Sequence, residues 1–205
     1  MKKWMTFFAA MLVALTGVSA QDAALAKIAK ANAELKNVEC AFERTRTLPA
    51  TGKVIKDKGQ LSYTAPGQLA MVYDNPKEML VINGDQLYLR RAGKPSKFDT
   101  SKNALMRGLR NMLVDCIQGN ARKVAQENNA DISVKEVADY YHITLTAREE
   151  GVKGFSKISL SYRKSDLLLV RMETIEFAGV AEIYSMSDFK KVPSIAASRF
   201  EIPKK

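Results

Sequence analysis

The side chains that most often carry out catalysis or bind metals are sparse in this sequence. His142 is the only histidine, and its neighbours Tyr141, Ile143 and Leu145 follow the alternation of a β-strand. A single histidine excludes a histidine-rich metal site, and it leaves no second histidine for a Ser–His or Cys–His hydrolase that needs one. We therefore interpret His142 as an ordinary strand residue.

The short motifs of common enzymes are also missing. The segment Gly154-Phe155-Ser156-Lys157-Ile158 lacks the closing glycine of a nucleophile elbow. The sequence contains neither a glycine-rich phosphate loop nor a clustered-cysteine metal site. The two catalytic carboxylates of a glycosidase can lie far apart in the sequence, because only their distance in the folded protein matters. No such pair stands out along this chain. We expect a protein that is not an enzyme and that uses no cofactor and no metal.

The two cysteines, Cys40 and Cys116, are far apart in the sequence. In an oxidising compartment they can form a disulfide, to which the loop-entropy model assigns about 4 kcal/mol. Two small buried hydrophobic residues are an equally natural role for cysteine. The sequence leaves both alternatives open, since pairing cannot be deduced from spacing.

Residues 1–20 have the pattern of a secretory signal peptide. Lys2 and Lys3 precede an apolar run over residues 7–18, and Val18-Ser19-Ala20 is a small-residue cleavage site. The run is shorter than the roughly 20 apolar residues that a membrane span needs. No cysteine follows Ala20 to mark the chain for lipid attachment. We expect cleavage near Ala20 and a single soluble domain over residues 21–205 in the periplasm.

An excess of basic residues remains in this mature segment. The formal net charge of the whole chain is +10, and the loss of Lys2 and Lys3 lowers it to +8. The basic residues are scattered among acids without an aromatic-basic motif, which argues against binding to nucleic acid. The charge favours transient contact with anionic lipid head groups or acidic partners. A mixed, solvated surface is the other interpretation.

The hydrophobic pattern predicts a helix followed by strands. Ala24, Ile28, Ala31 and Leu35 mark one face of a helix over residues 21–36. The period then changes to two, and the alternating segments predict strands at residues 38–43, 61–63, 69–73, 79–82 and 87–89. Pro66-Gly67 and Asn83-Gly84 supply turns, the second typical of a type I′ hairpin.

Helical spacing returns over residues 101–120, with Ser101 as the cap and Gly119 as the end, and a short helical piece continues to about Gln126. Further strands are predicted at residues 132–137, 140–147, 155–162, 167–177 and 180–189, and a last short one contains Phe200 and Ile202. About ten strands joined by short turns predict an antiparallel sheet that curls into a barrel or a deep half-barrel. Its lumen must hold a helix, a ligand or both.

The order of these elements resembles the periplasmic outer-membrane lipoprotein carrier family, the LolA type. The likeness lies in the strand Val38-Glu39-Cys40-Ala41-Phe42 and in the segment Lys58-Gly59-Gln60-Leu61-Ser62-Tyr63-Thr64-Ala65-Pro66-Gly67. It continues through Leu80-Val81-Ile82-Asn83-Gly84-Asp85-Gln86-Leu87-Tyr88 and closes with Phe200-Glu201-Ile202-Pro203. The order agrees over nearly the whole mature chain, and the residue-level likeness concentrates in residues 38–89.

The resemblance implies an open, incomplete antiparallel β-barrel, mainly β with α, whose helical lid covers an apolar cavity. It also implies acylated lipoproteins as cargo, an inner-membrane ATP-driven transporter that loads the carrier, and an outer-membrane acceptor; we expect a monomer. On this sequence the expected cavity residues are Leu61, Tyr63, Leu69, Met71, Met79, Val81, Leu87 and Leu89. The expected lid residues are Leu105, Met106, Leu109, Met112 and Leu113. The methionines suit irregular aliphatic cargo.

One position departs from the family. Well-known members carry an arginine immediately before the proline that corresponds to Pro66, and it bonds the lid in the closed state. Here that position is Ala65. The sequence therefore predicts a lid held by apolar contacts alone, unless a Cys40–Cys116 bridge ties it down or Arg107 or Arg110 contributes.

Two other functions are compatible with the same sequence. A carrier of another amphiphile, such as a glycolipid, needs the same apolar walls. The second is a regulatory domain of the same fold that senses lipoproteins or a peptide. Such a sensor normally has another domain, and we expect this chain to have no length for one.

Overall fold

The computed structural model describes residues 19–149 and 154–203. The predicted signal peptide lies outside these residues except for Ser19 and Ala20. The helices are α1 (Ala20–Ala33), α2 (Ala104–Ile117) and α3 (Ala121–Glu127). The first six strands are β1 (Asn37–Leu48), β2 (Lys53–Thr64), β3 (Gln68–Tyr73), β4 (Met79–Asn83), β5 (Gln86–Arg91) and β6 (Lys94–Asp99). The other five are β7 (Ala130–Val137), β8 (Tyr140–Ala147), β9 (Phe155–Arg163), β10 (Leu169–Glu176) and β11 (Ala181–Lys191).

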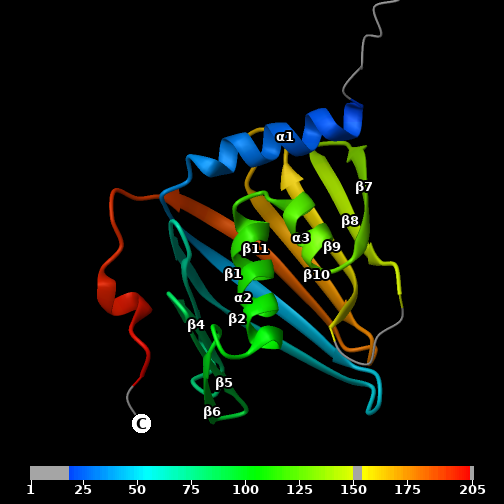
Figure 1. Cartoon of the computed structure of the whole chain (residues 1–205). Helices are drawn as coiled ribbons and strands as arrows, with labels where there is room; N and C mark the ends of the chain where they lie inside the picture. Colours follow the sequence, from blue (N-terminus) through cyan, green and yellow to red (C-terminus); the bar gives the residue numbers. More distant parts are fainter. Residues whose placement is uncertain (1–18, 150–153, 204–205) are drawn as a thin grey trace, which may run out of the picture.

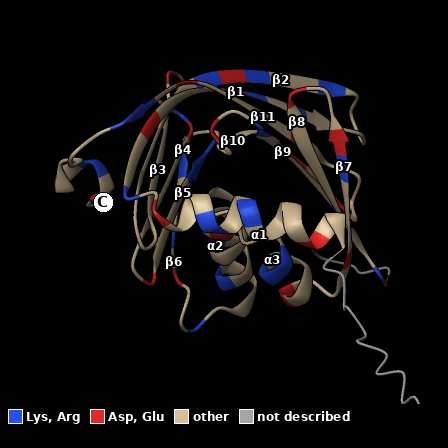
Figure 2. Ribbon diagram, turned by 90° about the horizontal axis from the view of Figure 1, so that it is seen from above, with Lys and Arg blue, Asp and Glu red and all other residues tan. Residues whose placement is uncertain are grey.

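In the described part of the chain, 11 strands form one sheet in the order β6-β5-β4-β3-β2-β1-β11-β10-β9-β8-β7, and each neighbouring pair is antiparallel. The two edge strands, β6 and β7, do not pair with each other, so the sheet stays open. Figure 2 shows it as an arch around the three helices. The prediction of an open antiparallel half-barrel with a helical lid is confirmed.

The helices occupy the concave side of this arch. Helix α1 crosses one end of the barrel, and α2 and α3 lie inside the opening, so that side chains of all three share one core with the sheet (Figures 1 and 2). The core is built from alternate residues of the strands, which point to the concave face because side chains alternate along a strand. The helices therefore fill the lumen that the sheet alone leaves empty.

Helix α1 is shorter than predicted and buries a different stripe. It ends at Ala33 instead of residue 36, and Ala31 is exposed. The buried residue at that position of the stripe is Asn32, whose side-chain nitrogen donates hydrogen bonds to the carbonyl oxygens of Ile28 and Leu167. A buried amide with two partners is stable there. The apolar pattern of the sequence could not indicate Asn32 as a buried residue, because its side chain is polar.

The start of α2 also differs from the prediction, whereas its end agrees. Asn103, and not Ser101, caps the helix, because its side-chain oxygen accepts from the Met106 amide at 3.1 Å. Gly119 follows the last turn with a φ of +73°, and a Cβ there would lie 2.8 Å from Ile28 of α1. This position therefore requires glycine for its backbone and for the close approach of the two helices.

A second, smaller core lies on the convex face of the sheet. Phe200 packs there against Ala70, Val81 and Tyr88. The predicted strand at Phe200 and Ile202 is wrong: Ala197–Phe200 is a 3₁₀-helix, and residues 201–203 have no regular structure. The segment lies across the outside of the sheet, where Asn83 donates to the carbonyl of Phe200.

The hairpin at Asn83-Gly84 is present, but its turn is shifted by one residue. Asn83 pairs with Gln86, which leaves Gly84 and Asp85 as the turn residues. Only Gly84 has a positive φ there, +58°, so the turn is not of type I′. Strand β6 was missing from the prediction because Lys94-Pro95-Ser96-Lys97 has the charged and proline-containing composition of an edge strand.

Candidate functional site

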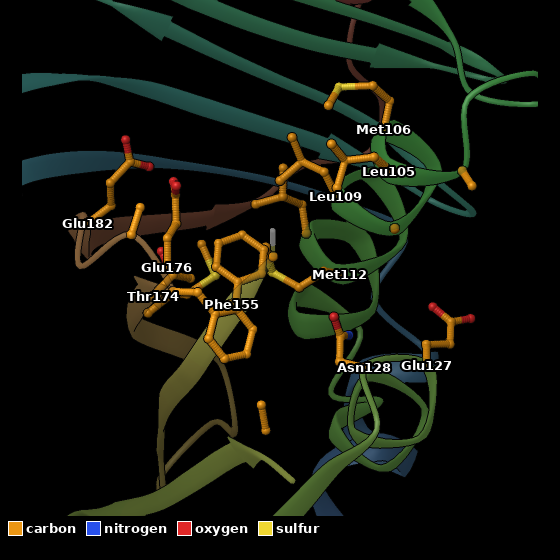
Figure 3. A pocket seen from close by; sticks show the side chains of 18 of the residues that line it. Leu105, Met106, Leu109, Met112, Glu127, Asn128, Phe155, Thr174, Glu176 and Glu182 are labelled. Carbon is orange, nitrogen blue, oxygen red and sulfur yellow. The ribbon is translucent and has the colours of Figure 1, made fainter. Parts of the chain in front are cut away.

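A cavity of about 750 Å³ lies between α2 and the concave face of the sheet. Its apolar lining comes from strands β3, β4, β5, β9 and β10 on one side and from the first ten residues of α2 on the other. Figure 3 shows Leu109 and Met112 of α2 opposite Phe155 across this space. The cavity opens to solvent beside Leu105, which is 51% exposed. Its size and lining are typical of a site for an apolar molecule.

The predicted lid residues all line this cavity, and the predicted sheet residues do so only in part. Leu105, Met106, Leu109, Met112 and Leu113 face it from α2. From the sheet, Met71 and Leu89 line it. Four more of the predicted residues point to the same concave face but are packed in the core outside the cavity lining: Leu61, Tyr63, Leu69 and Leu87.

The predicted orientation of Met79 and Val81 is wrong. Both belong to the convex core, and it is Leu80 and Ile82 that point inward, paired with Met71 and Leu69 on β3. The segment Met79-Leu80-Val81-Ile82 is apolar at every position, so alternation could not show which residues face inward. Both faces are apolar because the C-terminal segment covers the outer one.

The prediction missed the part of the cavity that is built by the second half of the chain. Phe155 lines it from β9 and Met172 from β10. Strands β9 and β10 were predicted, and Met172 and Thr174 alternate with the charged Arg171 and Glu173, as inward residues do. The signal was therefore present, but the resemblance directed the prediction to the first five strands.

The C-terminal end of α2 is anchored to the sheet by hydrogen bonds. The side-chain nitrogen of Gln118 donates to the hydroxyl of Tyr63 at 2.8 Å and to the carbonyl oxygen of Pro66 at 3.0 Å. The hydroxyl of Tyr162 on β9 donates to the carbonyl oxygen of Cys116 at 2.5 Å. The prediction that apolar contacts alone hold the lid is therefore wrong, because polar bonds join both halves of the sheet to this end.

The two arginines considered as possible latches form hydrogen bonds with α2 itself or with the residues just before it. The guanidinium of Arg107 donates to the carbonyl oxygens of Thr100 and Ser101, just before α2. Arg110 donates to Asn111, its neighbour in the helix. Among the described residues, it is Gln118 whose side chain joins the end of α2 to Tyr63 and Pro66.

Both cysteines are buried and carry free thiols. Burial raises the pKa of Cys40 to about 12. Burial also raises the pKa of Cys116, to which the nearby Asp115 carboxylate contributes. The thiols are protonated at neutral pH and therefore unreactive. In this structure the hydrophobic interpretation holds, and no bridge joins Cys40 to Cys116 of the lid.

An ion pair across the lumen forms part of the cavity lining. Arg91 of β5 and Glu182 of β11 approach to 3.6 Å, although four strands separate them in the sheet. Glu182 also lies 3.2 Å from Nε of Arg46 and accepts a hydrogen bond from Tyr184. Curling of the sheet thus brings β5 and β11 together, and their polar side chains form part of the cavity wall.

A buried charge cluster lies behind this wall. Arg44 is 3% exposed and contacts Asp57 at 2.5 Å and Glu78 at 3.1 Å. Its guanidinium also stacks 4.6 Å from the ring centre of Tyr73. Burial alone opposes the charge of Arg44, but Tyr73 and the hydrogen bond to Asp57 raise its pKa above the ordinary value. The cluster joins β1 to β2, β3 and the start of β4.

The single histidine lies in an ordinary strand environment. His142 lies on β8, and its Nδ1 is 3.1 Å from the Ser161 hydroxyl on β9, as cross-strand neighbours are. Within residues 19–149 and 154–203, no three His, Cys, Asp or Glu side chains gather as a metal site requires. None of the helices in the described residues has the length and apolar content to cross a bilayer.

The chain is similar to several proteins of known structure. A protein of Thermus thermophilus has a similar structure, with a TM-score of 0.51 and 9% identity over 89% of this chain and 94% of the other. A LolA superfamily protein of Nitrosomonas europaea (TM-score 0.41, 10% identity) covers 87% of this chain and 97% of its own. The lipoprotein LppX of Mycobacterium tuberculosis (0.44, 13%) covers 84% and 97%. No curated protein matches. The family model "Outer membrane lipoprotein carrier protein LolA" matches residues 33–203, and the chain belongs to this family.

Proposed function

We propose that this protein is a periplasmic carrier that shields the acyl chains of lipoproteins on their way from the inner to the outer membrane. The observation that supports this most directly is the cavity of about 750 Å³ between α2 and the sheet, walled by leucine, methionine and phenylalanine side chains. Its flexible methionines adapt to irregular aliphatic chains. The membership of the LolA family supports the same proposal.

The size of the cavity sets how much cargo it shields in this state. If a methylene takes up about the 30 Å³ of a water molecule, a chain of about 16 carbons needs about 480 Å³. The cavity of about 750 Å³ then holds one such chain completely and part of a second. A cargo with more chains requires α2 to move away from the sheet.

The anchoring of α2 suggests how that movement occurs. Its C-terminal end is bonded to Tyr63, Pro66 and Tyr162. Its N-terminal half, with Leu105 half exposed, forms the open side of the cavity. We propose that this half swings outward while the anchored end stays in place, so that acyl chains enter beside Leu105.

Energy considerations require partners at both membranes. Burying about 16 methylenes stabilises the loaded carrier by about 13 kcal/mol relative to chains in water. Cargo therefore does not leave without an acceptor of similar or greater affinity. We propose an ATP-driven transporter of the inner membrane as the loading partner and an outer-membrane receptor as the acceptor. The carrier acts as a monomer that contacts membrane surfaces transiently.

A matched pair of substitutions tests the cavity. Leu105 is 51% exposed at the cavity mouth and Val137 is 54% exposed at the β7–β8 hairpin, so Leu105→Glu and Val137→Glu add the same charge at similar exposure. Leu109→Glu adds it deeper in the cavity. The measurement is binding of a fluorescent dipalmitoylated lipopeptide to the purified protein, with circular dichroism to confirm folding.

We expect Leu109→Glu to reduce affinity at least tenfold, Leu105→Glu to reduce it less, and Val137→Glu to leave it unchanged. Equal binding by all four folded proteins would place the cargo elsewhere. Mass spectrometry of lipids bound to protein isolated from the periplasm then identifies the cargo: acylated peptides support the proposal, and a glycolipid alone contradicts it.

A further inference from the structure

The β1–β2 hairpin extends beyond the strand that pairs with it on its other side. Strand β2 pairs with β1 over its whole length, from Lys53 to Thr64, but with β3 only from Gly59 to Thr64. Residues Lys53–Asp57 of β2 therefore form a free edge of the sheet. Figure 1 shows this part of the hairpin, in cyan, away from strands β4, β5 and β6.

The register of the sheet shows which backbone groups face this edge. The carbonyl oxygen of Lys58 accepts a hydrogen bond from the amide of Asp74, on the side of β3. In an antiparallel ladder, the N–H and C=O of one residue point to the same side of the strand, and those of the next residue point to the other side. The amides and carbonyls of Val54 and Lys56 therefore face the edge, where none of the described strands pairs with them.

The two outer edges of the sheet are protected, in contrast to this one. Strand β6 carries Pro95, which has no amide to donate. On β7, the side-chain amide of Gln21 takes the place of a strand. Its Nε2 donates to the carbonyl oxygen of Ile132 at 3.3 Å, and its Oε1 accepts from the amide of Val134 at 3.1 Å. The edge at Lys53–Asp57 has neither a proline nor such a side-chain cap among the described residues.

The side chains along the free edge are basic and apolar. Lys53 and Lys56 are exposed and belong to none of the ion pairs between described residues. Val54 is 53% exposed, and Ile55 is half-buried. The one carboxylate of this segment, that of Asp57, is 5% exposed and is paired inside the sheet. A second copy of this edge would bring lysine against lysine, whereas an acidic strand brings opposite charges together.

The edge also lies close to the cavity. Ile55 pairs with Arg46 of β1, and Nε of Arg46 is 3.2 Å from the carboxylate of Glu182. Glu182 lines the cavity together with Arg91. A strand that is added to β2 therefore lies near the site in which we place the cargo.

We infer that the Lys53–Asp57 edge of β2 is a docking site for an acidic, extended segment of a partner protein, which adds to the sheet as a further strand. Backbone hydrogen bonds to Val54 and Lys56 give affinity, and carboxylates that meet Lys53 and Lys56 give specificity. The contact needs no cargo. It therefore goes beyond the proposed carrier function and is tested separately from it.

Two short peptides test this site, an acetylated octapeptide of repeated Val-Glu and one of repeated Val-Lys. Each is titrated at low salt into the purified protein without cargo, and the backbone amide signals are followed by NMR. We expect the Val-Glu peptide to shift the signals of Val54 and Lys56, to slow their hydrogen exchange, and to bind at least fivefold more tightly than the Val-Lys peptide. The signals of Ile132 and Val134, at the edge that Gln21 covers, should stay unchanged.

Three variants locate the contact. Val54→Pro removes an amide that faces the free edge and not β1, so the hairpin should stay folded by circular dichroism while the affinity for the Val-Glu peptide falls at least tenfold. Lys53→Glu/Lys56→Glu should reverse the preference, so that the Val-Lys peptide binds more tightly. Lys94→Glu/Lys97→Glu is the matched control, because it makes the same change of charge at exposed positions of β6 and should keep the preference for the Val-Glu peptide.

The results that would overturn this inference are specific to the edge. Equal binding of the two peptides, shifts that spare Val54 and Lys56, or unchanged binding by a folded Val54→Pro protein would each contradict it. If the unmodified protein forms a dimer in sedimentation experiments and Val54→Pro abolishes it, the edge belongs to a second copy and the acidic partner is wrong. The proposed carrier function is decided by lipopeptide binding to Leu109→Glu, whichever way these experiments end.

Discussion

The side-chain amide of Gln118, directly after α2, donates a 2.8 Å hydrogen bond to the hydroxyl of Tyr63 on β2. The same nitrogen donates to the carbonyl oxygen of Pro66 in the following turn. One residue thus joins the helix over the cavity to two points of the sheet. Ala65, next to Pro66, has no side chain able to form such a bond, so the latch lies on the helix and not on the strand.

Gln118→Ala is expected to loosen α2 without unfolding the sheet. Two neutral hydrogen bonds contribute about 1–3 kcal/mol in total, which corresponds to an open population about fivefold to 150-fold larger. Hydrogen exchange followed by mass spectrometry should show faster exchange in α2 peptides, with strands β1 and β2 unchanged. Release of a bound lipopeptide to vesicles should be faster in the same variant.

Asn111→Ala is the control for this substitution. Asn111 is also on α2, but its amide contacts Glu127 of α3 at 3.4 Å and does not reach the sheet. It should leave the exchange of α2 within about twofold of the unmodified protein. If Gln118→Ala exchanges like Asn111→Ala, the bonds to Tyr63 and Pro66 do not hold the helix.

Arg44→Met is expected to destabilise the whole sheet. Removing the cation leaves the carboxylates of Asp57 and Glu78 without their buried partner, and breaking such a pair costs about 3–5 kcal/mol. Urea unfolding at neutral pH measures the change in free energy. Arg171→Met, which breaks a half-exposed pair with Glu173, should cost less than about 1 kcal/mol. Similar losses in both variants would show that the cluster adds little.

Local patterns predicted most of this fold because each hairpin carries its own signal. The alternation in β2, β3 and β5 gave the correct inward face, with Leu61, Met71 and Leu87 on the concave side. The spacing of α2 correctly placed Leu109 and Met112 toward the sheet. In β2 and α2 one face is apolar and the other polar, so periodicity alone fixes the orientation.

The failures occur where a distant segment changes what a face contacts. Strand β4 is apolar on both faces because Phe200, more than a hundred residues later, covers its outer side. The contact between Arg91 and Glu182 depends on the curvature of the sheet over several strands. Gln118 is a common polar residue at a helix end, and only the position of Pro66 gives it a role. None of these relationships has a signal within its own segment.

Phe200→Ala tests the convex core separately from the cavity. Phe200 is 1% exposed, and truncating a buried phenylalanine typically costs about 3–5 kcal/mol. We expect a loss of stability toward the lower end of this range, because the cluster is small, together with unchanged affinity for a dipalmitoylated peptide. Thermal unfolding and probe displacement measure the two. A large loss of affinity in the folded variant would show that the C-terminal segment controls the cavity.

Alkaline pH is expected to destabilise the protein through its buried thiols and phenols. Burial raises the pKa of Cys40 to about 12, from an unperturbed value of 9.0, and it also raises the pKa values of Cys116, Tyr162 and Tyr184. The folded protein therefore holds these protons at pH values where the unfolded chain releases them. The free energy of unfolding should be constant up to about pH 8 and should fall progressively as pH rises above about 9.

Urea unfolding at about pH 8 and about pH 10.5 measures this dependence, and Cys40→Ala separates out one contribution. The variant is less stable at both pH values because it loses packing, but its stability should fall less between them. A thiol reagent at about pH 8 should label neither cysteine until urea unfolds the chain, since only the thiolate reacts. An equal fall in stability for Cys40→Ala, or rapid labelling of the folded protein, would mean that the Cys40 thiol is ionised or exposed in the native state.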